Sequence, residues 1–169
     1  FPHAYASLLH VIRRVHEARD ALRGQIPVAY LQNYDMTLGK LMCAGVDIWL
    51  NTPLPPLEAS GTSGMKAAIN GVPSLGVLDG WWIEGHIEGM TGWSVGGWIE
   101  SRTKLRPGTD ASYAAALYAK LAEEVVACFY QDRERFIKIM RRAIALNGAF
   151  FTSQRMLAQY VHNAYRMVG

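Results

Sequence analysis

The sequence contains only two cysteines in 169 residues, Cys43 and Cys128, which lie far apart in apolar segments without metal-type spacing. This scarcity argues against a disulfide framework and a zinc site, and it favours a reducing, cytoplasmic setting. Long apolar runs are also missing: none reaches the ~18 residues of a membrane span, and no basic region followed by an apolar stretch opens the chain. We therefore expect a soluble protein without a membrane partner or a bound metal.

Basic side chains are few in the first part of the chain. Residues 1–100 carry 6 basic and 9 acidic side chains, whereas residues 101–169 carry 11 and 5. The basic excess falls in helical patterns, where a solvated face is the simplest interpretation. No base-reading motif accompanies it, so we expect no nucleic-acid partner.

The apolar pattern predicts alternating helices and strands. Half of the positions are apolar, which suffices for one core. We expect a single unit over 1–169, with a Rossmann-like core to about 110 and a helical tail over 111–169. The predicted elements are helices at 5–22, 36–45 (capped by Asp35) and 62–70, strands at 26–31, 46–50 and 73–78, an elaborated loop at 79–97, and three helices from about 111. This alternation predicts an α/β fold with a parallel sheet and helices on both faces.

The segment "EASGTSGMKAAING", residues 58–71, is the main candidate site. It follows a predicted strand and runs into a helix that starts near Thr62 or Ser63, where open α/β sheets bind ligands. Amides at a helix start attract anions, and Gly61 and Gly64 let a phosphate approach the backbone closely. The alternative is an ordinary Ser/Thr cap; the Walker and dinucleotide glycine patterns are both absent.

Lys66 is the only lysine or arginine between Lys40 and Arg102, and its neighbours in sequence are apolar. A lysine in such a setting could condense with a phosphate-bearing aldehyde such as pyridoxal phosphate. The alternative is a lysine packed against the surface with its head in water. Glu58 could hold sugar hydroxyls or be a solvated loop carboxylate. Four of the five tryptophans could stack on sugar rings or pack beneath the loop; they are Trp81, Trp82, Trp93 and Trp98.

The stretch "LQNYDMTLGKLMCAGVDIWLNTPLPPLEASGTSGMKAAINGVPSLGVLDGWWIEG" resembles the cofactor-binding core of the α-glucan (glycogen/maltodextrin) phosphorylases. The pattern E-A-S-G-T-x-x-M-K, the later N-G and L-D-G, and the upstream N-Y pair stand in the order of that family. The Trp-Trp pair after Asp79-Gly80 resembles the short prokaryotic type. The similarity extends more weakly over nearly the whole chain, which resembles the carboxy-terminal part of the second Rossmann-like domain of a GT-B type glycosyltransferase fold.

The resemblance implies an enzyme that uses pyridoxal 5'-phosphate. By this resemblance Lys66 forms the Schiff base and is the catalytic position, and Thr62, Ser63 and Tyr34 hold the cofactor phosphate. Glu58, Ser60 and Gly61 match positions that contact the glucosyl unit. The implied reaction is phosphorolysis of glycogen or maltodextrin by inorganic phosphate, in which the cofactor phosphate acts as a proton shuttle and glucose 1-phosphate is released with retention.

Proteins of this family are several times longer, so we expect a fragment that is inactive alone and needs the rest of a phosphorylase chain. A homo-oligomer is one further expectation. Two alternatives remain open: a non-catalytic module that binds pyridoxal phosphate or a sugar phosphate, and a nucleotide-sugar glycosyltransferase domain.

Overall fold

The computed structural model describes residues 2–96, 98–101, 104–106 and 109–165. The chain divides into two compact units, Phe1–Gly39 and Lys40–Gly169. The expectation of a single unit over 1–169 stays a prediction. None of the described helices is both long enough and apolar enough to cross a bilayer.

The first unit consists of a long helix and an extended segment. Helix α1 spans Pro2–Ala21 and is followed by Gly24 at a φ of 84°, as the sequence predicts. The predicted strand at 26–31 is wrong, because no described strand pairs with it. An unpaired extended segment gains no ladder hydrogen bonds, and Ile26 and Leu31 are about half exposed. Helix α2, Met36–Gly45, begins in the first unit and ends in the second. It is confirmed, and the Asp35 carboxylate accepts the Leu38 amide at 2.7 Å.

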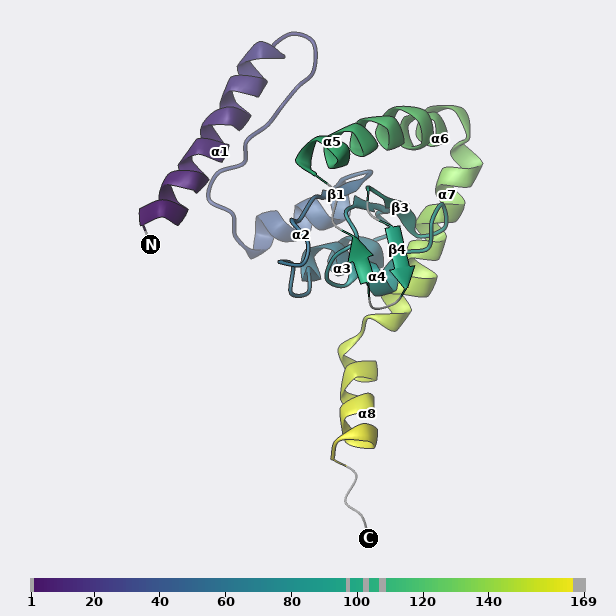
Figure 1. Cartoon of the computed structure of the whole chain (residues 1–169). Helices are drawn as coiled ribbons and strands as arrows, with labels where there is room; N and C mark the ends of the chain where they lie inside the picture. Colours follow the sequence, from purple (N-terminus) through teal and green to yellow (C-terminus); the bar gives the residue numbers. More distant parts are fainter. Residues whose placement is uncertain (1, 97, 102–103, 107–108, 166–169) are drawn as a thin grey trace. The chain divides into compact units, whose positions relative to one another are not determined.

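The second unit is built on a parallel sheet (Figure 1). Strands β1 (Trp49–Asn51), β2 (Ser74–Gly76) and β3 (Gly92–Ser94) lie in the order β1-β2-β3, and both pairings are parallel. The predicted strands at 46–50 and 73–78 are confirmed in shorter form. The parallel arrangement predicted from the alternation of elements is confirmed as well.

The predicted loop at 79–97 is wrong in part, since it contains helix α4, Trp82–Gly85, and strand β3. Gly92 has a φ of 154°, and a side chain there would collide with the Ser74 carbonyl oxygen of β2. The sheet therefore needs a glycine at a position where glycine favoured a loop in the sequence. Strands β4 (Trp98–Ser101) and β5 (Lys104–Arg106) form an antiparallel pair that the sequence analysis did not predict.

Four stretches of helix complete the unit. Helix α3 spans Thr62–Ile69 and ends before Gly71, as predicted. The three predicted carboxy-terminal helices are confirmed: α5 (Asp110–Ala119) continues through η1 (Lys120–Val125) into α6 (Val126–Gln131), α7 (Arg133–Arg142) continues through η2 (Ala143–Gly148), and α8 spans Ser153–Asn163. The side chains of Thr109, Asp132 and Thr152 cap α5, α7 and α8.

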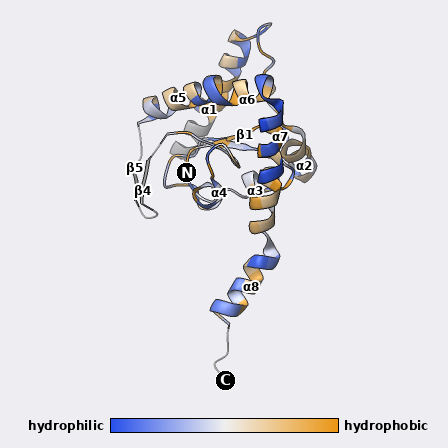
Figure 2. Cartoon of the chain, turned by 90° about the vertical axis from the view of Figure 1, so that its right-hand side faces the viewer, coloured by the Kyte–Doolittle hydropathy of each residue, from blue (hydrophilic) through white to orange (hydrophobic). Residues whose placement is uncertain are grey.

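Two apolar clusters hold the helices to the sheet. The larger joins β2 and β3 to the carboxy-terminal helices through Leu75, Val77, Trp93, Val95, Val125, Cys128, Phe136 and Ile139. The smaller consists of Ala68, Leu78, Trp81 and Trp82. Helices α5 and α6 lie on one side of the sheet, and α3 and α4 lie on the other (Figures 1 and 2). The predicted α/β layout is thus confirmed.

Candidate functional site

The connection from β1 to α3, residues 52–61, leaves the carboxyl end of a parallel strand. In open α/β sheets this edge is where ligands bind. The connection contains the predicted substrate positions Glu58, Ser60 and Gly61, all of which are half-buried. The turn at residues 79–81, which follows β2, holds this connection in place.

Asp79 fixes the first contact between the two segments. Its side chain is buried, and its two carboxylate oxygens accept the amides of Glu58 and Gly80, each at 2.9 Å. A buried carboxylate must be hydrogen-bonded to be tolerated, and this one binds two backbone donors. Sequence reasoning missed this role. The signal was an aspartate between a strand and a glycine, because aspartate bonds to nearby amides in turns.

Ser60 and Gly80 form the second contact. The Trp81 amide donates to the Ser60 carbonyl oxygen at 2.7 Å. Gly80 has a φ of 53°, and a Cβ there would lie 2.6 Å from that same oxygen and 2.9 Å from Glu58 Cγ. A Cβ at Gly61 would in turn lie 3.6 Å from Glu58 Cδ. The structure therefore brings Glu58, Ser60 and Gly61 together around the 79–81 turn.

Helix α3 begins without a side-chain cap. Its N-cap residue is Gly61, in the left-handed region at φ 84° and ψ 47°, and within the described residues no side chain accepts a hydrogen bond from the amides of the first turn. The ordinary Ser/Thr cap is therefore not what stands here. The first amides of a helix need partners from outside it and carry partial positive charge, so this start has the character of an anion site.

Thr62 and Lys66 lie on one face of α3. They are four residues apart and both are exposed, whereas Ala67 and Ala68 are completely buried. Helical side chains lean toward the amino-terminal end of their helix, which directs Lys66 toward the first turn. The expected apolar surroundings of Lys66 are wrong, because Lys66 is exposed and the helical period turns its neighbours Ala67 and Ala68 into the core. Ser63 is half-buried, and its carbonyl oxygen lies 3.9 Å from Cys43 Sγ.

Tyr34 belongs to the first unit. Its side chain is 68% exposed, and its hydroxyl oxygen lies against Gly39, where a Cβ would come within 2.5 Å of it. Its predicted contact with a cofactor phosphate stays a prediction. Of the tryptophans, Trp81, Trp82 and Trp93 are buried, which favours packing over stacking on sugar; the side chain of Trp98 lies outside the described residues.

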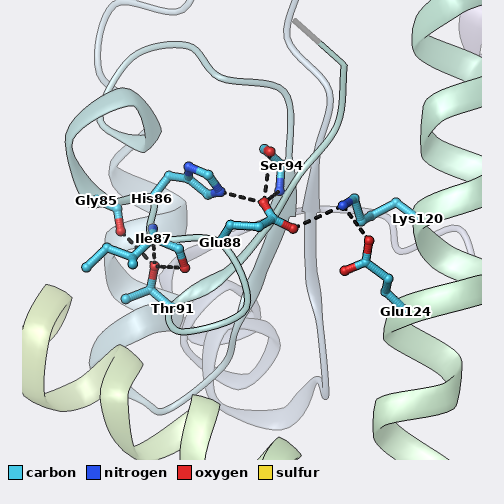
Figure 3. Close-up of polar contacts among 8 residues, drawn as sticks. All are labelled: Gly85, His86, Ile87, Glu88, Thr91, Ser94, Lys120 and Glu124. Carbon is cyan, nitrogen blue, oxygen red and sulfur yellow. Dashed lines mark hydrogen bonds and ion pairs between the residues drawn. The ribbon is translucent and has the colours of Figure 1, made fainter. Parts of the chain in front are cut away.

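A second polar cluster surrounds Glu88 (Figure 3). One carboxylate oxygen meets His86 Nε2 at 2.7 Å and accepts the Ser94 amide and hydroxyl at 3.0 and 2.9 Å. The other accepts Lys120 Nζ at 3.0 Å, and Lys120 also donates to Glu124 at 2.6 Å. The cluster ties the segment before β3 to helix η1.

These bonds shift two pKa values. Partial burial opposes ionisation of Glu88, but the hydrogen bonds from His86, Ser94 and Lys120 outweigh it and lower its pKa to about 2. Burial likewise works against the Lys120 ammonium, yet the bonds to Glu124 and Glu88 raise its pKa above the ordinary value. Sequence reasoning missed this cluster, because its main partners lie on separate elements and no local pattern links them. Its groups bind one another, which indicates a structural tie.

Comparison with known proteins relates the chain to one family. The sequence model of the carbohydrate phosphorylases matches residues 4–91. Maltodextrin phosphorylase of Thermococcus litoralis is 41% identical over 157 residues, which are 91% of this chain and 18% of that protein. Glycogen phosphorylase of Aquifex aeolicus is 42% identical over 146 residues, 83% of this chain and 20% of that protein. The chain thus spans about a fifth of the length of these curated relatives.

Solved structures support the fold. The crystal structure of Anabaena Alr3699/HepE in complex with UDP-glucose matches 92% of this chain and 37% of that chain, with a TM-score of 0.65 and 18% sequence identity. At this identity the likeness concerns the fold alone. It confirms the Rossmann-like, GT-B type architecture predicted from the sequence.

Proposed function

Because the chain belongs to the carbohydrate phosphorylase family, we propose that it is the cofactor-binding part of an α-1,4-glucan phosphorylase. The reaction of the whole enzyme is phosphorolysis of glycogen or maltodextrin, with glucose 1-phosphate as product. The proposed setting is the cytoplasm, the proposed substrates are an α-glucan and inorganic phosphate, and the proposed partner is the rest of a phosphorylase chain.

The observation that carries the proposal is the start of α3. A glycine in the left-handed conformation takes the N-cap position, no side chain from the described residues caps the turn, and Thr62 and Lys66 share one exposed face. The first turn of α3 can therefore bind an anion while Lys66 reacts with an aldehyde, and one small ligand can carry both groups. Pyridoxal 5'-phosphate has these two groups, and the residues present fit it.

In this proposal each residue has a defined task. Lys66 holds the cofactor covalently through its amino group, and Thr62 and Ser63 bind its phosphate through their amides and hydroxyls. Tyr34 contributes a further hydroxyl. When bound, the cofactor supplies a phosphate group that exchanges a proton with the substrate phosphate.

The sugar side of the site is assigned to Glu58, Ser60 and Gly61. Glu58 offers carboxylate oxygens to sugar hydroxyls, and its backbone is fixed by Asp79 at 2.9 Å. Ser60 is held through its carbonyl oxygen by the Trp81 amide, and its hydroxyl, for which the described residues show no hydrogen bond, is assigned to the sugar. Catalysis by such an arrangement depends on placing reactants and stabilising charge, which a rigid loop favours.

A spectroscopic titration with pyridoxal 5'-phosphate tests the proposal. We expect a new absorbance band of lysine-bound cofactor in the unmodified chain and its loss in Lys66→Ala. Lys40→Ala is the matched control, since Lys40 is also exposed and is the nearest preceding lysine. A band that persists in Lys66→Ala, or that never forms in the unmodified chain, contradicts the assignment.

A further inference from the structure

The indole of Trp81 lies between the start of α3 and helix α4. Its side chain is only 5% exposed. Three glycines face it. A Cβ at Gly64 would lie 2.6 Å from the indole Nε1, one at Gly85 would lie 2.7 Å from Cζ3, and one at Gly61 would lie 3.0 Å from Cδ1. Two of these distances are too short for real atoms, so the backbone can approach this ring only where Cβ is missing.

The ring is held on its other sides as well. Phe151 meets it edge-on with ring centroids 5.3 Å apart, and Trp82 lies at 5.1 Å. The backbone amide of Trp81 donates to the Ser60 carbonyl oxygen at 2.7 Å. A ring with neighbours on several sides cannot move by itself, and it therefore fixes the position of the backbone that packs against it.

We propose that Trp81 is a positioning residue that sets the place and direction of the first turn of α3. It acts through the backbone of Gly61 and Gly64 on the amides of Thr62 and Ser63. The inference rests on the proposed function, because those amides are the ones assigned to the cofactor phosphate. Gly61, Gly64 and Gly85 thus have a shared purpose: they make room for one indole.

The next residue provides a matched control. Trp82 is 3% exposed and belongs to the same apolar cluster as Trp81. The atoms nearest to Gly61 and Gly64, however, belong to Trp81 and Glu58. Substitution of either tryptophan by phenylalanine removes a similar buried volume, but only Trp81→Phe removes the part of the ring beneath α3.

The test compares cofactor affinity in the two variants by absorbance titration. We expect Trp81→Phe to weaken pyridoxal 5'-phosphate binding by about tenfold while the band at saturation still depends on Lys66, and Trp82→Phe to change it by less than about twofold. Thermal unfolding of both variants reports the cost of the lost volume, which should be similar. Equal affinities in the two variants overturn the inference.

A readout without cofactor separates the two proposals. If the unmodified chain binds no pyridoxal 5'-phosphate, the proposed function fails, and the amide order parameters of Thr62 and Ser63 from NMR relaxation decide the inference. They should fall in Trp81→Phe and stay unchanged in Trp82→Phe; unchanged values in both overturn it.

A double-mutant cycle tests the same contact through stability alone, without cofactor. Gly64→Ala should destabilise the chain strongly because its methyl group meets the indole. The same change should cost less in a Trp81→Ala background, where the ring is gone. If the losses in free energy of unfolding from Gly64→Ala and Trp81→Ala simply add in the double variant, the proposed contact is contradicted.

Discussion

The carboxylate of Asp79 holds two amides that no other described side chain accepts, those of Glu58 and Gly80. Asp79→Ala should therefore leave both donors without their partner. We expect the free energy of unfolding to fall by about 2 kcal/mol, the usual cost of orphaned polar groups. Chemical denaturation followed by tryptophan fluorescence measures it.

Asp47→Ala is the control for this change, because Asp47 is exposed and the described residues show no hydrogen bond to its side chain. It should change stability by less than about 0.5 kcal/mol. Asp79→Asn keeps one acceptor oxygen and should fall between the two. A similar stability for all three variants would show that the bonds of Asp79 do not hold the 58–61 segment.

The individual site residues were predictable to the extent that they form a local pattern. Gly61, Thr62 and Lys66 stand within one helical turn and a half, so the local pattern predicted a helix start near Thr62 or Ser63 that is soon followed by a lysine. Asp79 and Trp81 come from another segment and meet that turn only through the fold. Their roles became evident from distances that no sequence spacing encodes.

Among the elements, the segment before β3 is tied to η1 through Glu88 and Lys120. The pKa of Glu88 is lowered from 4.5 to about 2, so the ionised form is favoured in the folded state. Its contribution to stability is full above pH 4.5 and is lost as the pH falls toward 2. Because the carboxylate is partly exposed, solvent screening limits this contribution to about 1 kcal/mol.

Glu88→Gln should accordingly lower the melting temperature at neutral pH, and its difference from the unmodified chain should shrink between pH 4.5 and 2. Thermal unfolding by circular dichroism at a series of pH values measures this. Glu123→Gln is the control, because Glu123 lies on η1, the helix that carries Lys120. Its carboxylate is exposed, and the described residues show no hydrogen bond or ion pair to it. If both variants follow the same pH curve, the tie through Glu88 contributes nothing.

Whole elements were predicted where the chain's own pattern decides them. Helices α1, α2 and α3 and the carboxy-terminal helices follow from apolar periodicity and caps such as Asp35. Strands were less predictable, because a strand depends on its neighbour. The apolar segment 26–31 has no described partner strand and stays irregular. Gly92 lies in a glycine-rich segment, yet it belongs to a strand that pairs with β2. It can do so because the Ser74 carbonyl oxygen fits only against a residue without a side chain.

At the scale of the whole molecule, the small number of lysine and arginine side chains near the proposed site limits the phosphorolysis that this chain can catalyse. Phosphorolysis brings a second phosphate beside that of the cofactor, and two such anions need cationic groups to hold them. Between Lys40 and Arg102 the only lysine or arginine is Lys66, which the proposal already assigns to the cofactor. We therefore expect the 169-residue chain, loaded with pyridoxal 5'-phosphate, to release no more glucose 1-phosphate from maltodextrin than Lys66→Ala does. A coupled assay for glucose 1-phosphate measures both, and release by the unmodified chain alone would mean that basic residues outside 41–101 reach the site.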